Sequence, residues 1–180
     1  MFSRRTGALH AHRWSQPAMT YFVTCCTQLR ANGLDVPPVE GVLRGIVVAS
    51  DDGRDTVTDA FTVMPDHIHW LFTLGNRLSL GRVIARLKAQ SGQAMTAARL
   101  DWQRDFFDHR LRADEAIERY GLYVFLNPYR AGLITADEKW PHWWCPHPEN
   151  LAFVSQLNLA GTPPPEWIVE PVQADLEIGE

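Results

Sequence analysis

Apolar positions along this 180-residue chain follow two spacings, alternate residues in some segments and every third or fourth residue in others. Alternation over short runs rich in β-branched and aromatic residues is typical of strands. It predicts strands at residues 21–27 (YFVTCCT), 56–63, 67–74 and 104–112 (RDFFDHRLR). The three residues MPD between the second and third strands predict a tight connection.

Helical spacing predicts three helices. Residues 79–100 carry apolar side chains at i, i+3, i+4 and i+7, and residues 39–49 follow a looser version of this pattern. A third helix is expected over residues 115–127, capped by Asp114 and kinked or ended by Pro128. The order strand, helix, strand, strand, helix, strand, helix predicts an α+β fold. We expect a ferredoxin-like split βαβ sandwich, a four-stranded antiparallel sheet with helices on one face.

Size and composition fit one globular domain, with 46% apolar and 21% charged residues. The sequence has no run of 18 or more apolar residues, so no membrane span is expected. Three cysteines cannot form a disulfide framework, which favours a reduced, cytoplasmic location.

The formal net charge of −4, taken whole, argues against a nucleic-acid-binding protein. The distribution of charge changes this inference. Residues 1–30 hold four arginines and no acid, and residues 77–112 hold eight Lys or Arg against three Asp. Residues 135–180 hold one Lys and eight acids. The positive charge of these two blocks is therefore balanced by acidic residues elsewhere in the chain. Each block can bind nucleic acid although the total charge is negative.

The segment MPDHIHWLF contains two histidines two residues apart. On a strand, His67 and His69 project from one face, whereas Ile68, Trp70 and Phe72 project from the other toward the core. The histidine pair then lies on the open face of the sheet, within reach of one metal ion. Taken alone, the pair also fits two partly exposed histidines without a ligand role, because a metal site needs more ligands.

The segment RYGLYVFLNPYRAGL places Tyr123 and Asn127 four residues apart, on one face of the predicted helix. An asparagine oxygen is a hard ligand that suits Mg²⁺ or Mn²⁺. A tyrosine one turn earlier would hold its phenol near the same ion. The alternative is a half-buried tyrosine beside a helix-ending Asn-Pro pair.

Together these segments resemble one family, the REP-associated tyrosine transposases among the single-tyrosine HUH transposases. Five motifs stand in the family's order over about residues 20–145. MPDHIHWLF corresponds to the MPNHxH strand, with Asp66 where Asn is more usual, and SLGRVIARLKAQSG to the helix that follows. WQRDFFDHRLR corresponds to the WQxxYxDxxIR strand, with Phe107 where Tyr is more usual. YVFLNPYRAGLI corresponds to the YIxxNPVRAGLV helix, and WPHWW to the WPxSS segment.

The resemblance implies that His67 and His69 are the HUH pair, which binds a divalent ion (Mg²⁺ or Mn²⁺) with Asn127 as third polar ligand. Tyr123 aligns with the nucleophile. Tyr120 lies seven residues before Asn127, on nearly the same helix face, and is the main competitor for that role. The implied activity is cleavage and strand transfer of single-stranded DNA, as in DNA transposition, through a covalent 5′-phosphotyrosine intermediate.

The implied partner is single-stranded DNA with a hairpin, such as a REP element, bound by a monomer or a homodimer. We interpret residues 1–20 as a basic N-terminal segment, 21–134 as the catalytic domain and 135–180 as a Trp/Pro-rich acidic extension. Basic side chains contact phosphates, and tryptophan stacks on unpaired bases. The candidate DNA-binding residues are Arg4, Arg5, Arg13, Arg82, Arg86, Lys88, Trp102, Arg104, Arg110 and Arg112.

Two other functions fit parts of the sequence. One is a catalytically inactive or domesticated protein that binds hairpin nucleic acid without cutting it. The presence of both histidines, Tyr123 and Asn127 argues against this reading, since drift would have damaged one of the four. The other is a ferredoxin-like metalloenzyme for small molecules, for which the basic blocks would have no use.

Overall fold

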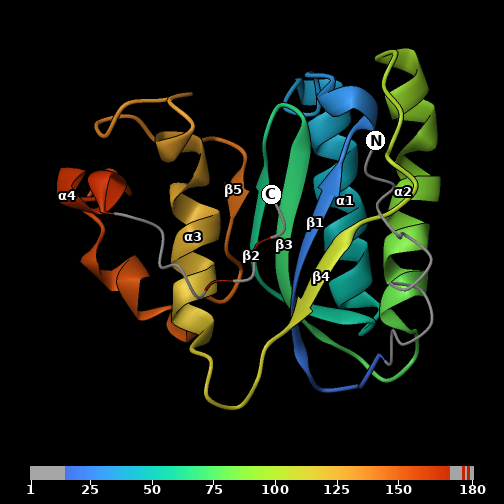
Figure 1. Cartoon of the computed structure of the whole chain (residues 1–180), viewed down its shortest axis with the longest axis horizontal. Coiled ribbons are helices and arrows are strands. Elements are labelled where there is room, and N and C mark those ends of the chain that lie inside the picture. The colour runs from blue at the N-terminus through green and yellow to red at the C-terminus, as the bar shows by residue number, and fades with distance from the viewer. Residues whose placement is uncertain (1–14, 171–175, 177, 179–180) are drawn as a thin grey trace, which may run out of the picture.

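The computed structural model describes residues 15–170, 176 and 178, and it shows a sheet with helices on both sides (Figure 1). The strands are β1 (Thr20–Cys26), β2 (Thr56–Val63), β3 (His67–Leu74), β4 (Phe107–Arg110) and β5 (Trp143–Trp144). The helices are α1 (Pro37–Asp52), α2 (Leu80–Ala97), α3 (Ile117–Arg130) and α4 (Pro165–Val169). Short 3₁₀ turns are η2 (Gln28–Arg30), η3 (Pro148–Asn150) and η4 (Ala152–Gln156). None of the helices in the described ranges is long and apolar enough to span a membrane.

The sheet is antiparallel, with the strand order β4-β1-β3-β2-β5. α1 connects β1 to β2, and β3 pairs between these two strands, which is the split βαβ arrangement. The predicted α+β fold is confirmed, and the strands predicted at 56–63 and 67–74 have the predicted bounds. The predicted first and fourth strands and the first two helices are present with shifted ends.

The register of β1 against β3 brings polar side chains together on one face. Thr24 lies opposite His69, and Cys26 lies opposite His67. Directly opposite residues on neighbouring antiparallel strands project from the same face. Both histidines therefore have a small polar neighbour on β1.

Helices cover both faces of the sheet, although the sequence pattern predicts one covered face. α1 and α2 pack on the face that carries Trp70, whereas α3 packs on the face that carries Leu71. The difference arises because nine of the ten residues 120–129 in α3 are buried. Because a helix with apolar side chains on most sides buries them against other elements, α3 is covered on two sides. The sheet provides one cover, and C-terminal residues such as Phe153 provide the other.

The sheet also has a fifth strand that the sequence pattern does not reveal. Trp143 and Trp144 of β5 pair with the outer edge of β2. Trp143 packs against the α3 side of the sheet and Trp144 against the α1–α2 side. A strand of two residues is too short to show a periodicity of two, so composition alone could not identify it.

The ends of α3 differ from the prediction. Asp114 does not cap the helix, which begins three residues later. The neighbouring Glu115 instead binds His109 of β4, with 2.9 Å between its carboxylate and Nε2. Pro128 does not end the helix, which continues for two more residues. Pro128 has no N–H to donate to the Val124 carbonyl, and the helix continues past it without this bond.

Candidate active site

Two histidines of β3 form the centre of the site. His67 and His69 project from the face of the sheet that α3 covers, as strand alternation requires. Their Nε2 atoms lie 3.1 Å apart. His69 is fully buried and His67 is 7% exposed. The two rings therefore present their Nε2 atoms to a common point.

The second ring nitrogen of each histidine is held by a neighbour. His67 Nδ1 lies 2.7 Å from Asp66 Oδ1, and His69 Nδ1 lies 2.9 Å from Thr24 Oγ1. Burial, followed by the nearby charges of His67 and Arg30, lowers the pKa of His69 well below its usual value. His69 is therefore neutral at pH 7, and a neutral imidazole can offer a nitrogen lone pair to a metal ion.

The spacing of the two Nε2 atoms fits a shared divalent ion. Two nitrogens that each lie about 2.1 Å from one ion, at a right angle, are about 3 Å apart. Within residues 15–170, 176 and 178, no three His, Cys, Asp or Glu side chains gather so that they could hold a metal ion. Among these described residues, a third ligand would be a group of another kind, such as an amide.

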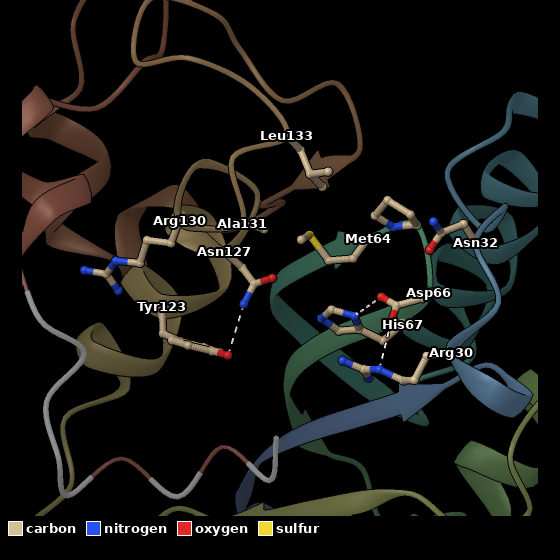
Figure 2. Close-up of a pocket in the computed structure, with 11 residues that line it drawn as sticks. Arg30, Asn32, Met64, Asp66, His67, Tyr123, Asn127, Arg130, Ala131 and Leu133 are labelled. Carbon is tan, nitrogen blue, oxygen red and sulfur yellow. Dashed lines mark hydrogen bonds and ion pairs between the residues drawn. The ribbon is translucent and has the colours of Figure 1, made fainter.

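α3 places a tyrosine and an asparagine across from the histidines. Tyr123 and Asn127 are buried and one turn apart, and Asn127 Nδ2 donates a hydrogen bond of 3.0 Å to Tyr123 Oη. The ring centroids of Tyr123 and His69 are 5.3 Å apart. Figure 2 shows the Tyr123 hydroxyl and the Asn127 amide on the side of α3 that faces His67. The fold thus brings together the four residues predicted as nucleophile and metal ligands.

The other tyrosines of α3 point elsewhere. Tyr120 donates a hydrogen bond of 3.3 Å to Glu115 Oε1, and its ring stacks on His109 with centroids 5.5 Å apart. Tyr129 donates a hydrogen bond of 2.9 Å to the carbonyl oxygen of Glu138. Tyr123 is therefore the α3 tyrosine whose hydroxyl lies beside the histidine pair.

An open cleft of about 450 Å³ lies between α3 and the turn that joins β2 to β3. Two of its arginines were not expected from the sequence. Arg130 lies three residues after Asn127, so the motif spacing could have identified it. Arg30 follows β1 outside any motif, and only the fold brings it here. The cleft is lined by Arg30, Asn32, Met64, Pro65, Asp66, His67, Tyr123, Asn127, Arg130, Ala131 and Leu133.

A family model described as "Transposase IS200 like" matches residues 15–115. The chain belongs to this transposase family. The match includes β3 with both histidines and ends before α3 begins. The family model therefore does not cover Tyr123 or Asn127, which are brought to the histidines by the fold.

A curated protein and a solved structure are among those that this chain resembles. A Haemophilus influenzae protein named "Putative REP-associated tyrosine transposase" is 28% identical over an alignment of 99 residues, and the match covers 47% of this chain and 56% of that protein. The chain thus spans about half the length of that curated relative. The solved structure of a REP-associated tyrosine transposase bound to a REP hairpin has a TM-score of 0.68 and 21% identity, and it covers 95% of this chain and 96% of its own. The fold is therefore shared, and the resemblance to REP-associated tyrosine transposases is confirmed.

The basic residues of α2 lie far from the cleft. α2 covers the face of the sheet opposite to α3, so Arg82 and Arg86 lie beyond the sheet from the histidines. Arg82 is exposed, whereas Arg86 forms an ion pair with the buried carboxylate of Asp55. The residues predicted to contact DNA in the N-terminal segment lie outside the described residues: Arg4, Arg5 and Arg13.

Three predicted DNA-binding residues are exposed at or beside β4, the edge strand next to β1. Arg104 lies before the strand, Arg110 is its last residue, and Arg112 follows it. Arg110 Nη1 donates a hydrogen bond of 3.0 Å to Gln16 Oε1. These arginines are accessible to a ligand and remain candidates for phosphate contacts.

Lys88 and Trp102 make structural contacts inside the protein. The Lys88 ammonium donates to the carbonyl oxygens of Gln103, Arg104 and Asp105, at 2.8, 3.3 and 2.9 Å. Trp102 Nε1 donates to Ser91 Oγ at 2.9 Å, and its ring packs against the α1–α2 core. Lys88 therefore ties the loop before β4 to α2.

Replacing Lys88 by Met is expected to lower the free energy of unfolding by about 1–2 kcal/mol, because three carbonyls lose their donor. Urea-induced unfolding, followed by circular dichroism, measures this change. Arg82→Met is the matched control on the same helix and should unfold as the wild type does. An unchanged stability of Lys88→Met, together with weaker DNA binding, would instead assign Lys88 to DNA contact.

Proposed function

We propose that this chain cleaves single-stranded DNA at hairpins of repetitive elements and transfers the cut strand, through a covalent 5′-phosphotyrosine on Tyr123. One observation carries the proposal: Tyr123, Asn127 and His67 line one cleft although they come from distant segments. The buried His69 contacts both the His67 imidazole and the Tyr123 ring. The solved REP-associated relative, whose structure contains a REP hairpin, supports the choice of substrate. We propose a cytoplasmic location, which agrees with such a substrate.

In this proposal, His67, His69 and Asn127 hold a divalent ion, Mg²⁺ or Mn²⁺. Hard divalent ions accept imidazole and amide ligands while keeping positions for phosphate oxygens. When bound, the ion would polarise the scissile phosphate and stabilise the charge that develops on the departing 3′ oxygen. Asp66 and Thr24 would keep the imidazoles oriented through their Nδ1 contacts.

Tyr123 supplies the attacking oxygen. The hydrogen bond from Asn127 Nδ2 to Tyr123 Oη orients the phenol and stabilises negative charge on its oxygen as the proton leaves. The bond from Oη to phosphorus forms, the bond from phosphorus to the 3′ oxygen breaks, and the 3′ oxygen takes up a proton. Because the phosphodiester is exchanged rather than hydrolysed, a second 3′-OH can reverse the reaction and join a new strand.

The test is incubation of purified protein with a 3′-end-labelled single-stranded hairpin that carries flanking single strands, in the presence of Mn²⁺ or Mg²⁺. We expect a labelled protein–DNA adduct that survives denaturing electrophoresis and disappears with EDTA. Hairpin binding without an adduct under either metal would favour a binding protein that does not cut. Absence of any DNA binding would contradict both functions.

A further inference from the structure

The turn after β1 has an unusual backbone. Leu29 and Arg30 have φ values of 56° and 55°, the left-handed region that favours glycine. Such conformations cost of order 1–3 kcal/mol each and persist only where the surroundings impose them. Here the turn is fixed to the β2–β3 connection. The N–H groups of Gly33 and Leu34 donate to the carbonyl oxygen of Pro65 at 2.8 and 2.9 Å.

The strained turn directs the Arg30 side chain back over the sheet. Arg30 Nε lies 2.8 Å from Asp66 Oδ2, and Nη1 donates to Cys26 Sγ at 2.7 Å. The other carboxylate oxygen of Asp66 binds His67 Nδ1. One carboxylate therefore positions both a predicted metal ligand and a guanidinium group, and the two are fixed relative to each other.

Two arginines line the cleft, and they are held differently. Arg130 Nη2 donates to the carbonyl oxygens of Trp167 and Glu170, and Figure 2 shows its guanidinium directed away from the cleft. The Arg30 guanidinium lies beside His67, on the side that faces Tyr123 (Figure 2). The Arg30 side chain is 48% exposed, although its Nε and Nη1 atoms have partners. It is thus oriented by protein groups and still open to a ligand.

We propose that Arg30 binds the phosphate that Tyr123 attacks, a role that rests on the proposed function. A guanidinium presents a planar set of N–H donors that matches phosphate oxygens, and its bonds to them are charge-assisted. Asp66 holds only the Nε edge, and the Cys26 thiol is a weak acceptor, so the outer N–H groups can turn to a stronger acceptor. The position beside His67 places the guanidinium and the predicted metal site on the same phosphate.

The experiment measures whether Arg30 and one particular phosphate act together. Hairpin oligonucleotides carry a single uncharged methylphosphonate, placed in turn at each phosphate flanking the hairpin foot. Binding is measured in Mn²⁺ by fluorescence anisotropy, and every protein carries Tyr123→Phe so that the DNA is not consumed. Arg30→Gln is the test variant. Arg77→Gln is the matched control, because Arg77 is bound to Gly53 and Asp55 outside the cleft lining.

We expect Arg30→Gln to weaken binding of unmodified DNA about tenfold and to have less than a twofold effect when the methylphosphonate replaces the phosphate that becomes linked to Tyr123. Wild-type adduct mapping identifies that phosphate. Arg77→Gln should show no such dependence. The assignment is wrong if Arg30→Gln weakens the binding of every oligonucleotide equally or of none. It is also wrong if the effect of Arg30→Gln is lost when a different phosphate is replaced.

A second variant and the wild-type adduct assay distinguish a folding defect and a failure of the proposed function from a wrong role for Arg30. Arg30→Gly removes the guanidinium and relieves the left-handed strain at this position, so it replaces Arg30→Gln if the latter does not fold. It should show the same dependence on one phosphate. The proposed function fails separately, when wild-type protein forms no adduct with the unmodified oligonucleotide in Mn²⁺.

Discussion

A Tyr123→Phe variant is expected to form no covalent adduct with hairpin DNA, a loss of more than about 10³-fold relative to the wild type. The substitution removes Oη and with it the hydrogen bond from Asn127. The phenyl ring keeps its packing against Phe22 and His69, whose ring centroids lie 5.8 and 5.3 Å away. Denaturing electrophoresis of labelled DNA measures the adduct, and thermal unfolding confirms that the variant is folded.

Tyr120→Phe is the matched control, because it removes the hydroxyl of another buried tyrosine on the same helix. Its hydrogen bond goes to Glu115, so the expected result is normal adduct formation with a stability loss of about 1 kcal/mol. If Tyr120→Phe abolished the adduct and Tyr123→Phe retained it, the assignment of the nucleophile would have to move by one turn of α3.

A His69→Ala variant is expected to bind Mn²⁺ at least roughly 100-fold more weakly than the wild type. Loss of groups that merely orient metal ligands already costs about 10–100-fold in affinity. His69 is fully buried and directs its Nε2 at the Nε2 of His67, so the substitution removes one of the two proposed imidazole ligands. Titration calorimetry or Mn²⁺ electron paramagnetic resonance measures the affinity without any DNA and independently of activity.

His109→Ala is the control for this measurement. His109 is also buried and bonded to a partner, but its contacts are Glu115 and Tyr120, outside the cleft lining. It should lower stability and leave Mn²⁺ affinity unchanged. Equal Mn²⁺ affinity in the wild type and in His69→Ala would remove His69 from the metal site.

The strand with the two histidines could be predicted from the sequence because its information is local. Alternation of apolar residues fixes which face each side chain occupies, and the residues MPD mark the turn before it. The same reasoning places Tyr123 and Asn127 on one helix face. It does not say which face of the sheet that helix covers, since this depends on how α3 is shared between the sheet and C-terminal residues such as Phe153.

The roles of the basic residues could not be predicted from neighbouring residues in the sequence. The charge block over residues 77–112 predicts a DNA-binding surface, but Arg86 pairs with Asp55 and Lys88 with three backbone carbonyls. Both sets of partners are distant in sequence, so composition cannot reveal them. Conversely, Arg30 reaches the cleft through the contacts of its turn with Pro65 and Asp66, which are distant in sequence.

If the proposed reaction takes place, the arrangement of the tyrosines limits how many DNA ends one chain can carry. The sequence has four tyrosines, and the hydroxyls of Tyr21, Tyr120 and Tyr129 bond to groups other than the histidine pair. With Tyr123 as the single attachment point, one chain holds one 5′ end at a time. Excision of a segment with two ends then requires either a second chain or a second round on the same chain. The stoichiometry of adduct to protein, measured at saturating DNA, would not exceed one.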